Sequence, residues 1–478
     1  MVSLQHDLAE EAIKAATSFG AGYAEARLHF NMQQEVAIKN GEFEPPGYSE
    51  SLGIGMRVLY KGAMAFGATN LLTKESVREL AERVTKNAKA SVKQFRKKVA
   101  LSEEKPHKAK WGAVEKELLE DVEVAKMISS LKEIESELLT SYGASTLPFR
   151  LIAINLLLEE KFYANTDGSR IESRVPRVNL FAVLTGMDSG NVVQRFVQTG
   201  RSGGWEVFRE GRFFERVKEE AGTIVKILKN ARKFTPGKFD VIVGPEVAGI
   251  MTHESVGHPG EADRILGREG AQAGESYLSS SDIGRQVGNE NATIIDDPTI
   301  PGSSGFYLFD DEGVSARKRI LIKNGKINEF LHNRETASEF SLKSNAAARA
   351  NQYSVEPIVR MANTYVEPGD MKLDEMIKEV KEGVIIKNFM EWNIDDKRFN
   401  QRYVGHEAYR IVNGELAEMI RNPVLEVTTP RLWSSISSKS RDLVFDSATC
   451  GKGDPSQGIP VWHGGPYMLL KDMYLGAR

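Results

Sequence analysis

The pattern of helix-like and strand-like segments changes near Thr235-Pro236-Gly237, and this change limits the possible folds more than any other feature. A proline followed by a glycine interrupts both helices and strands. Helical stretches alternate with strand-like runs before this point, whereas short strand-like runs separated by turns dominate after it. The 478 residues also exceed the roughly 100 to 200 residues of a typical domain. We therefore predict an α+β protein with two domains, residues 1–235 and a strand-rich domain of residues 236–478.

Four local patterns lead to specific predictions of secondary structure. The apolar spacing between Trp205 and Ala231 predicts one long helix. The run Leu151 to Leu157, followed by Glu159 to Tyr163, is typical of a hairpin that leads to the turn Asn165-Thr166-Asp167-Gly168. The dipeptides Asn324-Gly325 and Asn413-Gly414 each lie between alternating segments, and this arrangement predicts two further hairpins with tight turns.

Charge and hydrophobicity exclude several classes of protein. Lysine and arginine number 63 and aspartate and glutamate 66, so the net charge is 63 − 66 = −3. This balance disfavours a protein that binds nucleic acid or an anionic membrane. The apolar runs are shorter than the roughly 18 residues of a membrane-spanning helix. Asp7, Glu10 and Glu11 stand where a secretory signal has basic and apolar residues, so we expect a cytoplasmic protein.

The segment that follows the predicted boundary carries an unusual group of polar residues. A buried strand is expected to end at Gly244-Pro245, where the proline can begin a helix. His253 and Glu254 then lie near the end of that helix, and His258 follows. The whole chain has only eight histidines, so two of them beside a carboxylate indicate a possible metal site. An ordinary strand and helix with two hydrogen-bonded histidines is the alternative.

The spacing of His253 and His258 does not suit a regular helix. Histidines four residues apart, as in His-Glu-x-x-His, differ by about 40° around an α-helix, whereas five residues rotate by about 140°. Two irregularities could bring the rings together. Gly257 could end the helix in a left-handed turn while Pro259 forces His258 into an extended conformation. A wide turn of the π type, which is common at functional sites, is the other solution.

The residue types indicate zinc chemistry. Neutral imidazoles bind Zn²⁺, and Glu254 could act as the general base for a zinc-bound water. A catalytic zinc ion needs a third protein ligand. Cys450 is the only cysteine, which excludes an internal disulfide, and its thiol is either a ligand or an inert buried group. The candidates for the third ligand are Cys450, His332, His406, His463, Glu261 and Asp263.

Several motifs resemble one family, the TldD/PmbA peptidases, and in particular its TldD subunit. His253-Glu254-x-x-x-His258 matches the HExxxH motif of that family. The other motifs are Ile295-Asp296-Asp297, Phe309 to Gly313, Ala362 to Tyr365, Glu407-Ala408-Tyr409 and Thr449 to Lys452, with a weaker likeness at Lys39-Asn40-Gly41 and Gly53 to Arg57.

The resemblance implies a zinc metallopeptidase that cleaves short or unfolded peptides. His253, His258 and Cys450 would bind Zn²⁺, and Glu254 would be the catalytic carboxylate. Residues 1–235 would supply the substrate cleft and dimer contacts, with the peptide lying as an extended strand against a sheet edge. The family pairs a zinc-bearing TldD-like subunit with a metal-free TldE-like one, so we expect a homodimer or such a heterodimer.

Two residues depart from the family pattern. Pro259 stands where glycine is expected, and His463 lies in a glycine-rich segment where no histidine is expected, so His463 is a possible rival ligand. A non-catalytic, TldE-like interaction subunit is the alternative function. The presence of His253, Glu254, His258 and Cys450 argues against it, because a subunit without metal needs no such set.

Overall fold

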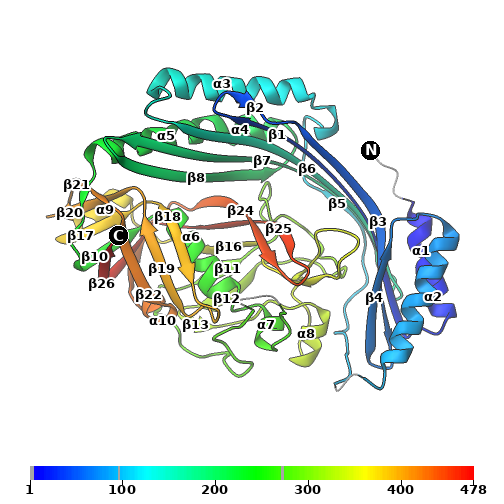
Figure 1. Cartoon of the computed structure of the whole chain (residues 1–478). Helices are drawn as coiled ribbons and strands as arrows, with labels where there is room; N and C mark the ends of the chain where they lie inside the picture. The colour runs from blue at the N-terminus through cyan, green and yellow to red at the C-terminus, as the bar shows by residue number, and fades with distance from the viewer. Residues whose placement is uncertain (1–4, 95–96, 271–273) are drawn as a thin grey trace.

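A curved sheet of eight strands dominates the first half of the chain in the computed structural model, which describes residues 5–94, 97–270 and 274–478 (Figure 1). Its main strands run in the order β4-β3-β1-β6-β7-β5, with β2 beside β1 and β8 beside β7. The strands are β1 (Tyr23–Lys39), β2 (Glu42–Phe43), β3 (Gly47–Tyr60), β4 (Ala63–Thr69), β5 (Lys108–Gly112), β6 (Phe149–Asn165), β7 (Arg170–Asp188) and β8 (Asn191–Ser202).

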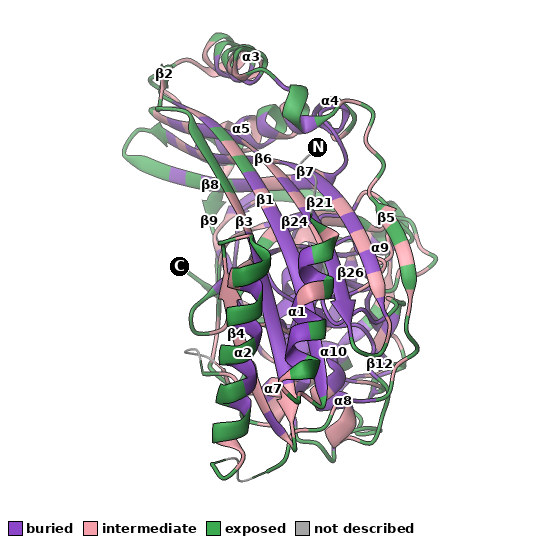
Figure 2. Cartoon of the chain, turned by 90° about the vertical axis from the view of Figure 1, so that its right-hand side faces the viewer, coloured by how far each residue is buried: buried purple, intermediate pink, exposed green. Residues whose placement is uncertain are grey.

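Helices cover the convex face of this sheet, and the second half of the chain lies on its concave side (Figures 1 and 2). The helices are α1 (His6–Ser18), α2 (Lys74–Ser91), α3 (Val124–Tyr142), α4 (Glu206–Glu210) and α5 (Phe213–Asn230). Buried and partly exposed residues alternate along much of β7, as expected for a strand with one face in the core. The first eight residues of β1 are all buried, because both faces of the sheet are covered there.

Two local predictions for the first half were wrong. Residues 151–163 belong to a single strand, β6, because β1 and β7 pair with it along its length and satisfy its backbone. The turn predicted from Asn165 to Gly168 is confirmed, and it connects β6 to the antiparallel β7. The predicted helix from Trp205 to Ala231 is divided into α4 and α5. Arg212 adopts a left-handed conformation with φ of 54°, which interrupts the α-helical hydrogen bonds between them.

The second half contains a ten-stranded sheet and a six-stranded sheet. The larger has the order β18-β19-β22-β26-β10-β17-β20-β21-β9, with β23 beside β26. Its strands are β9 (Arg232–Lys233), β10 (Gly237–Val243), β17 (Glu382–Ile386), β18 (Phe389–Ile394), β19 (Asn400–Gly405), β20 (Ala408–Val412), β21 (Glu415–Arg421), β22 (Pro423–Thr428), β23 (Ile436–Lys439) and β26 (Met468–Ala477).

The six-stranded sheet has the order β13-β12-β11-β16-β25-β24, so β24 lies at its edge. Its strands are β11 (Ile294–Asp296), β12 (Arg319–Lys323), β13 (Lys326–Ile327), β16 (Asn363–Val366), β24 (Val444–Lys452) and β25 (Gln457–Gly465). A separate pair consists of β14 (Ala348–Arg349) and β15 (Ile358–Val359).

Both Asn-Gly hairpins are confirmed. Asn324 and Gly325, with φ of 48° and 77°, connect β12 to β13. Asn413 and Gly414, with φ of 51° and 79°, connect β20 to β21. Two consecutive positive φ angles define the type I′ turn that this dipeptide favours.

The helix α6 (Pro245–Thr252) follows β10 and packs against β24, β25 and β16. It therefore lies between the two sheets, in the largest hydrophobic core of the molecule. The remaining helices are α7 (Ala262–Ile265), α8 (Arg334–Glu339), α9 (Leu373–Lys378) and α10 (Thr429–Ser434), with one 3₁₀ turn, η1 (Leu119–Asp121). No helix within the described ranges is both long enough and apolar enough to cross a membrane.

Candidate metal centre

A single π-helical turn, η2 (His253–Gly257), continues α6 and brings the two predicted histidines together. The backbone N–H of His258 donates to the carbonyl of His253 at 3.0 Å, so residues five apart lie on one face. The two imidazole rings are 4.8 Å apart between centroids. The π-type turn predicted from the spacing is therefore confirmed.

The alternative conformation, in which Pro259 forces His258 out of the helix, was wrong. His258 has φ of −58° and ψ of −47°, which is α-helical, and Gly257 does not adopt a positive φ. Gly257 allows the turn to approach Met361 closely. A Cβ atom there would lie 1.9 Å from the sulfur of Met361, so any larger residue would have to displace that buried side chain.

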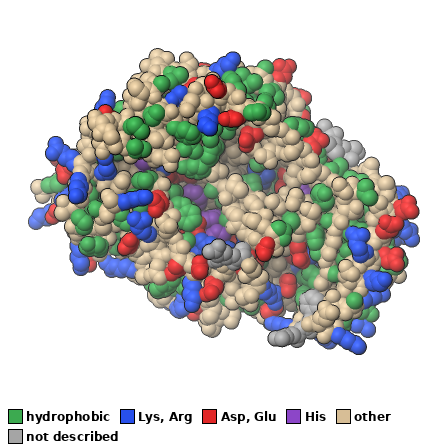
Figure 3. Space-filling model, viewed as in Figure 1, with side chains coloured by type: hydrophobic (Ala, Val, Ile, Leu, Met, Phe, Trp, Pro, Cys, Tyr) green, Lys and Arg blue, Asp and Glu red, His purple; other side chains and the backbone are tan. Residues whose placement is uncertain are grey.

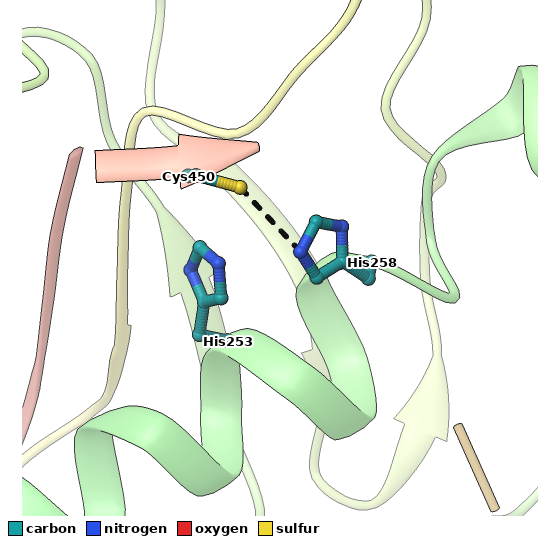
Figure 4. Close-up of side chains that lie close together, drawn as sticks. All are labelled: His253, His258 and Cys450. Atoms are coloured by element: carbon teal, nitrogen blue, oxygen red, sulfur yellow. Dashed lines mark hydrogen bonds between the residues drawn. The ribbon is translucent and has the colours of Figure 1, made fainter. Parts of the chain in front are cut away.

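The strand β24 places Cys450 beside this turn (Figure 4). Ligand atoms of His253, His258 and Cys450 all lie within 4.8 Å of one another, and the three residues are buried. The Cys450 sulfur is 3.4 Å from Nε2 of His258. Nδ1 of His253 is buried without a hydrogen-bond partner in the described structure. Two imidazole rings and one thiol therefore lie close enough together to contact one metal ion.

The protonation states of these groups suit a metal ion. Burial lowers the pKa of both His253 and His258 and so favours the neutral imidazole, which is the form that binds metal. Burial raises the pKa of the Cys450 thiol, but its interactions with His258 and Arg360 outweigh burial and bring the value to about 7. The lowered pKa favours the thiolate, which is the form of cysteine that binds metal.

Glu261 and Asp263, two of the candidate ligands, instead support the residues around the centre. Glu261 is fully buried and lies 3.0 Å from Nδ1 of His258, which turns the other ring nitrogen toward Cys450. Lys452 donates to Asp263 at 2.7 Å and lies 3.3 Å from Glu261. This lysine therefore links the strand that carries Cys450 to the segment after the π-helical turn.

Glu254 lies next to the cluster and forms a buried ion pair with Arg398. Arg398 comes from the turn between β18 and β19, where it adopts a left-handed conformation with φ of 64°. Asp395 accepts hydrogen bonds from the backbone of Phe399 and Asn400 and stabilises this turn. The sequence analysis missed Arg398, because nothing in the spacing of a residue 144 positions from Glu254 indicates this contact.

The remaining histidines occupy other positions. His463 is buried near His253, with 6.2 Å between the ring centroids, but it is not part of the three-residue cluster. Burial and the nearby charge of His253 lower its pKa to about 3. His332 accompanies Thr336 and Phe340, and His406 lies near Arg195 and Glu220, so the structure does not bring either into the cluster.

The cluster lines a cavity of about 370 Å³, here called the metal cavity, which also exposes Glu254, Arg398 and His463. Histidine side chains are visible in a hollow below the upper layer of the molecule (Figure 3). Arg195 of β8 reaches this cavity and donates to Glu220 of α5 and to Glu246 of α6. These ion pairs connect the curved sheet to the helix that carries the histidines.

The donor set fits a zinc ion. Zinc prefers nitrogen and sulfur ligands, and a catalytic site uses three protein ligands with one position left open. His253, His258 and Cys450 would hold the ion, and Glu261 would orient His258. The cavity that these residues line also reaches Glu254.

Comparisons with known proteins find matches over most of the chain. Three family models match the chain: PmbA/TldA metallopeptidase domain 1 over residues 24–88, the central domain over 117–229 and the C-terminal domain over 236–477. A metalloprotease of Archaeoglobus fulgidus is 31% identical over 94% of this chain and 98% of its own length. A protein of Saccharolobus solfataricus named zinc metalloprotease TldD homolog is 26% identical over 97% and 99%.

A solved structure with the same fold is that of TldE from Thermococcus kodakarensis. It has a TM-score of 0.76 and 16% sequence identity, and the match covers 98% of this chain and all of that one. The matched domains account for most of the chain, and the A. fulgidus relative is similar over nearly its whole length. The chain therefore belongs to the TldD/PmbA family of metallopeptidases.

Proposed function

We propose that this protein is a zinc-dependent peptidase that cleaves short or unfolded peptides. The observation that supports it most directly is the buried cluster of His253, His258 and Cys450, with Glu254 beside it in the same cavity. The name of the S. solfataricus relative, a zinc metalloprotease, agrees with this assignment.

Glu254 would act as the general base and Arg398 as the residue that holds it. A bound zinc ion would supply Lewis acidity, which activates water and polarises the carbonyl of the peptide bond. Glu254 would accept a proton from the attacking water and then deliver it to the departing amine. The ion pair with Arg398 fixes the direction of the carboxylate within the cavity.

The strand that carries Cys450 favours an extended substrate. Among the described strands, β24 pairs only with β25, so no strand pairs with its other edge. Residues 446–451 of this strand line the metal cavity. An extended peptide could add to the edge of β24 through main-chain hydrogen bonds, and its backbone would then pass the metal ligands. A folded protein already uses these groups in its own secondary structure.

This proposal predicts that zinc-loaded protein cleaves an unfolded substrate and spares the same substrate when it is folded. A small protein with removable disulfides provides both states at one temperature. The appearance of fragments is followed by mass spectrometry, with chelator-treated protein as the control. Equal cleavage of both states would contradict the extended binding mode, and equal cleavage with and without chelator would contradict the metal dependence.

We also propose that the working form is a dimer, formed by two copies of this chain or by one copy and a TldE-like subunit. Support comes from the fold, which is shared with TldE of T. kodakarensis. Light scattering of the purified chain is expected to give a mass above the 53.1 kDa of one copy. A monomer that is fully active without any added subunit would contradict this prediction.

The cluster favours the peptidase over a metal-free interaction subunit of the TldE kind. An interaction subunit has no use for neutral histidines, an ionisable thiol and a carboxylate around one cavity. Metal analysis of the purified protein separates the two functions. About one zinc ion per chain is expected for the peptidase, and none for the interaction subunit.

A further inference from the structure

A second cavity, the arginine cavity, lies between the curved sheet and the second half of the chain. Its volume is about 390 Å³, and its walls include Arg177 of β7, Arg349 of β14 and Lys161 of β6. It adjoins the same hairpin as the metal centre. Cys450 lines the metal cavity, and its cross-strand partner Ile459 lines the arginine cavity.

Arg177 and Arg349 are buried without a close carboxylate. Arg349 is 7% exposed and donates to the carbonyls of Met361 and Pro460, at 2.8 and 3.0 Å. Arg177 is 3% exposed, and its Nε donates to the carbonyl of Ser304. Its Nη1 lies 3.9 Å from Glu159, and its Nη atoms make no hydrogen bond to the described residues. Both guanidinium groups thus carry charge that nearby anions do not fully balance.

This situation differs from that of other buried arginines in the molecule. Arg57, Arg150 and Arg319 each form an ion pair with a buried carboxylate. Burial lowers the pKa of Arg349 to about 10, and the nearby charge of Arg177 contributes in the same direction. Burial also lowers the pKa of Arg177. An anion in this cavity would offset the cost of burying these two charges.

The carboxylates around the cavity are already engaged. Lys161 lies 3.2 Å from Glu159 and 2.9 Å from Asp311. Asp310 accepts three backbone hydrogen bonds, and burial with the charge of Glu312 raises its pKa, which favours its neutral form. Glu50, which also lines the cavity, is exposed and accepts from the Tyr48 hydroxyl. Two buried arginines and the partly buried Lys161 therefore face two charged carboxylates, the buried Asp311 and the partly buried Glu159.

Two further atoms of the cavity lack partners. Nε1 of Trp111 and Oδ1 of Asn351 are buried, and neither forms a hydrogen bond within the described structure. The first is a donor and the second an acceptor. Together with the arginines, they could bind both the carboxylate oxygens and the preceding N–H of a peptide.

A third cavity, the central groove, shares lining residues with both the arginine cavity and the metal cavity. It has a volume of about 700 Å³. Gly458 and Pro460 line both the central groove and the arginine cavity, and Gln198 and Thr449 line both the central groove and the metal cavity. Thr449 and Pro460 are cross-strand partners. Neighbouring strands lie about 4.8 Å apart, so the residues that the central groove shares with the two cavities lie on adjacent strands of one hairpin.

We infer that the arginine cavity is a subsite for a carboxylate of the peptide substrate, bound by Arg349 and Arg177. This inference rests on the proposed peptidase function. The carboxylate is either the C-terminus of a short peptide or an acidic side chain. A carboxylate would receive charge-assisted hydrogen bonds from two fixed guanidinium groups, which a neutral amide would not.

Binding to the Glu254→Gln variant tests the subsite without turnover. One fluorescent, unstructured peptide is prepared as the free acid, as the C-terminal amide, and as an amide ending in glutamate. Fluorescence anisotropy is expected to show that the free acid binds about tenfold or more tightly than the amide. Tight binding of the glutamate amide would identify side chains as a second source of the carboxylate, and weak binding would restrict the subsite to the C-terminus.

Substitution of the arginines provides the decisive comparison. In the Glu254→Gln background, Arg349→Met should remove the preference for the free acid while changing amide binding less than about twofold. Arg441→Met is the matched control, since Arg441 is exposed and lines none of the three cavities. If thermal unfolding shows that Arg349→Met does not fold, Arg177→Gln replaces it. Equal binding of acid and amide, a preference that survives the substitution, or no binding of any peptide would overturn the inference.

The peptidase function and the carboxylate subsite can each be refuted without refuting the other. Loss of the acid preference alongside zinc-dependent cleavage of unfolded peptides would overturn the subsite and leave the peptidase function intact. An acid preference that depends on Arg349, in a protein that cleaves no peptide, would overturn the peptidase function and support a carboxylate-binding groove.

Discussion

Glu254→Gln is expected to lower peptidase activity by about 10²- to 10⁴-fold while zinc remains bound. The amide cannot accept the proton of the attacking water, so catalysis loses its general base. The amide oxygen can still accept a hydrogen bond from Arg398, which lies against Glu254 in the structure. We therefore expect a folded protein with unchanged metal content. Activity is measured as kcat/KM on an unfolded peptide, and zinc by elemental analysis of the same sample.

Glu415→Gln serves as the matched control, because Glu415 is exposed on β21 and lines none of the three cavities. It makes the same chemical change and should leave kcat/KM within about twofold. Thermal unfolding of both variants separates a catalytic loss from a folding defect, since Glu254→Gln weakens a buried ion pair. Activity of Glu254→Gln within a few-fold of the parent would remove Glu254 from the role of general base.

Cys450→Ser is expected to weaken zinc binding by at least about 100-fold and to abolish most peptidase activity. Replacing even a residue that only orients a ligand typically costs 10- to 100-fold in metal affinity, and losing a ligand costs more. Glu261→Gln should therefore show an intermediate loss, because Glu261 contacts Nδ1 of His258. Zinc affinity is measured by competition with a chromogenic chelator, which does not depend on activity.

The His463→Gln variant tests whether His463, rather than Cys450, is the third zinc ligand. His463 lines the metal cavity but lies outside the three-residue cluster. The variant should retain zinc. Retention of zinc by Cys450→Ser, together with loss by His463→Gln, would reverse the assignment.

The single cysteine allows a second test in the unsubstituted protein. Alkylation of Cys450, followed by mass spectrometry, should be slow with zinc and faster after chelation. Equal labelling in both states would contradict a zinc-bound thiolate.

Local patterns in the sequence predicted those features that depend on neighbouring residues. The five-residue spacing of His253 and His258 required an irregular turn, and the structure has a π-helical turn there. The Asn-Gly hairpins formed because few other dipeptides adopt two positive φ angles without strain. The choice between the two possible turns at His258 was open, because the spacing alone is compatible with both.

Predictions that depend on distant partners were less accurate. Residues 151–163 resembled a hairpin, but β1 and β7 pair with them on both sides and hold them as one strand. The helix predicted from Trp205 to Ala231 has apolar residues at suitable positions, yet Arg212 adopts a left-handed conformation that divides it. Tertiary contacts override local preference in such cases, because pairing or packing of a whole segment outweighs the propensities of its residues.

The sequence by itself determined the chemistry of the site, since two histidines, a glutamate and one cysteine can be read directly from it. The tertiary structure decided how those groups are used. It placed Cys450 beside a turn almost 200 residues away in the chain, paired Glu254 with Arg398, and used Glu261 to orient His258. It also brought Arg177 and Arg349 to one cavity from the two halves of the chain. Contacts between distant segments arise from sheet pairing and core packing, which no local pattern records.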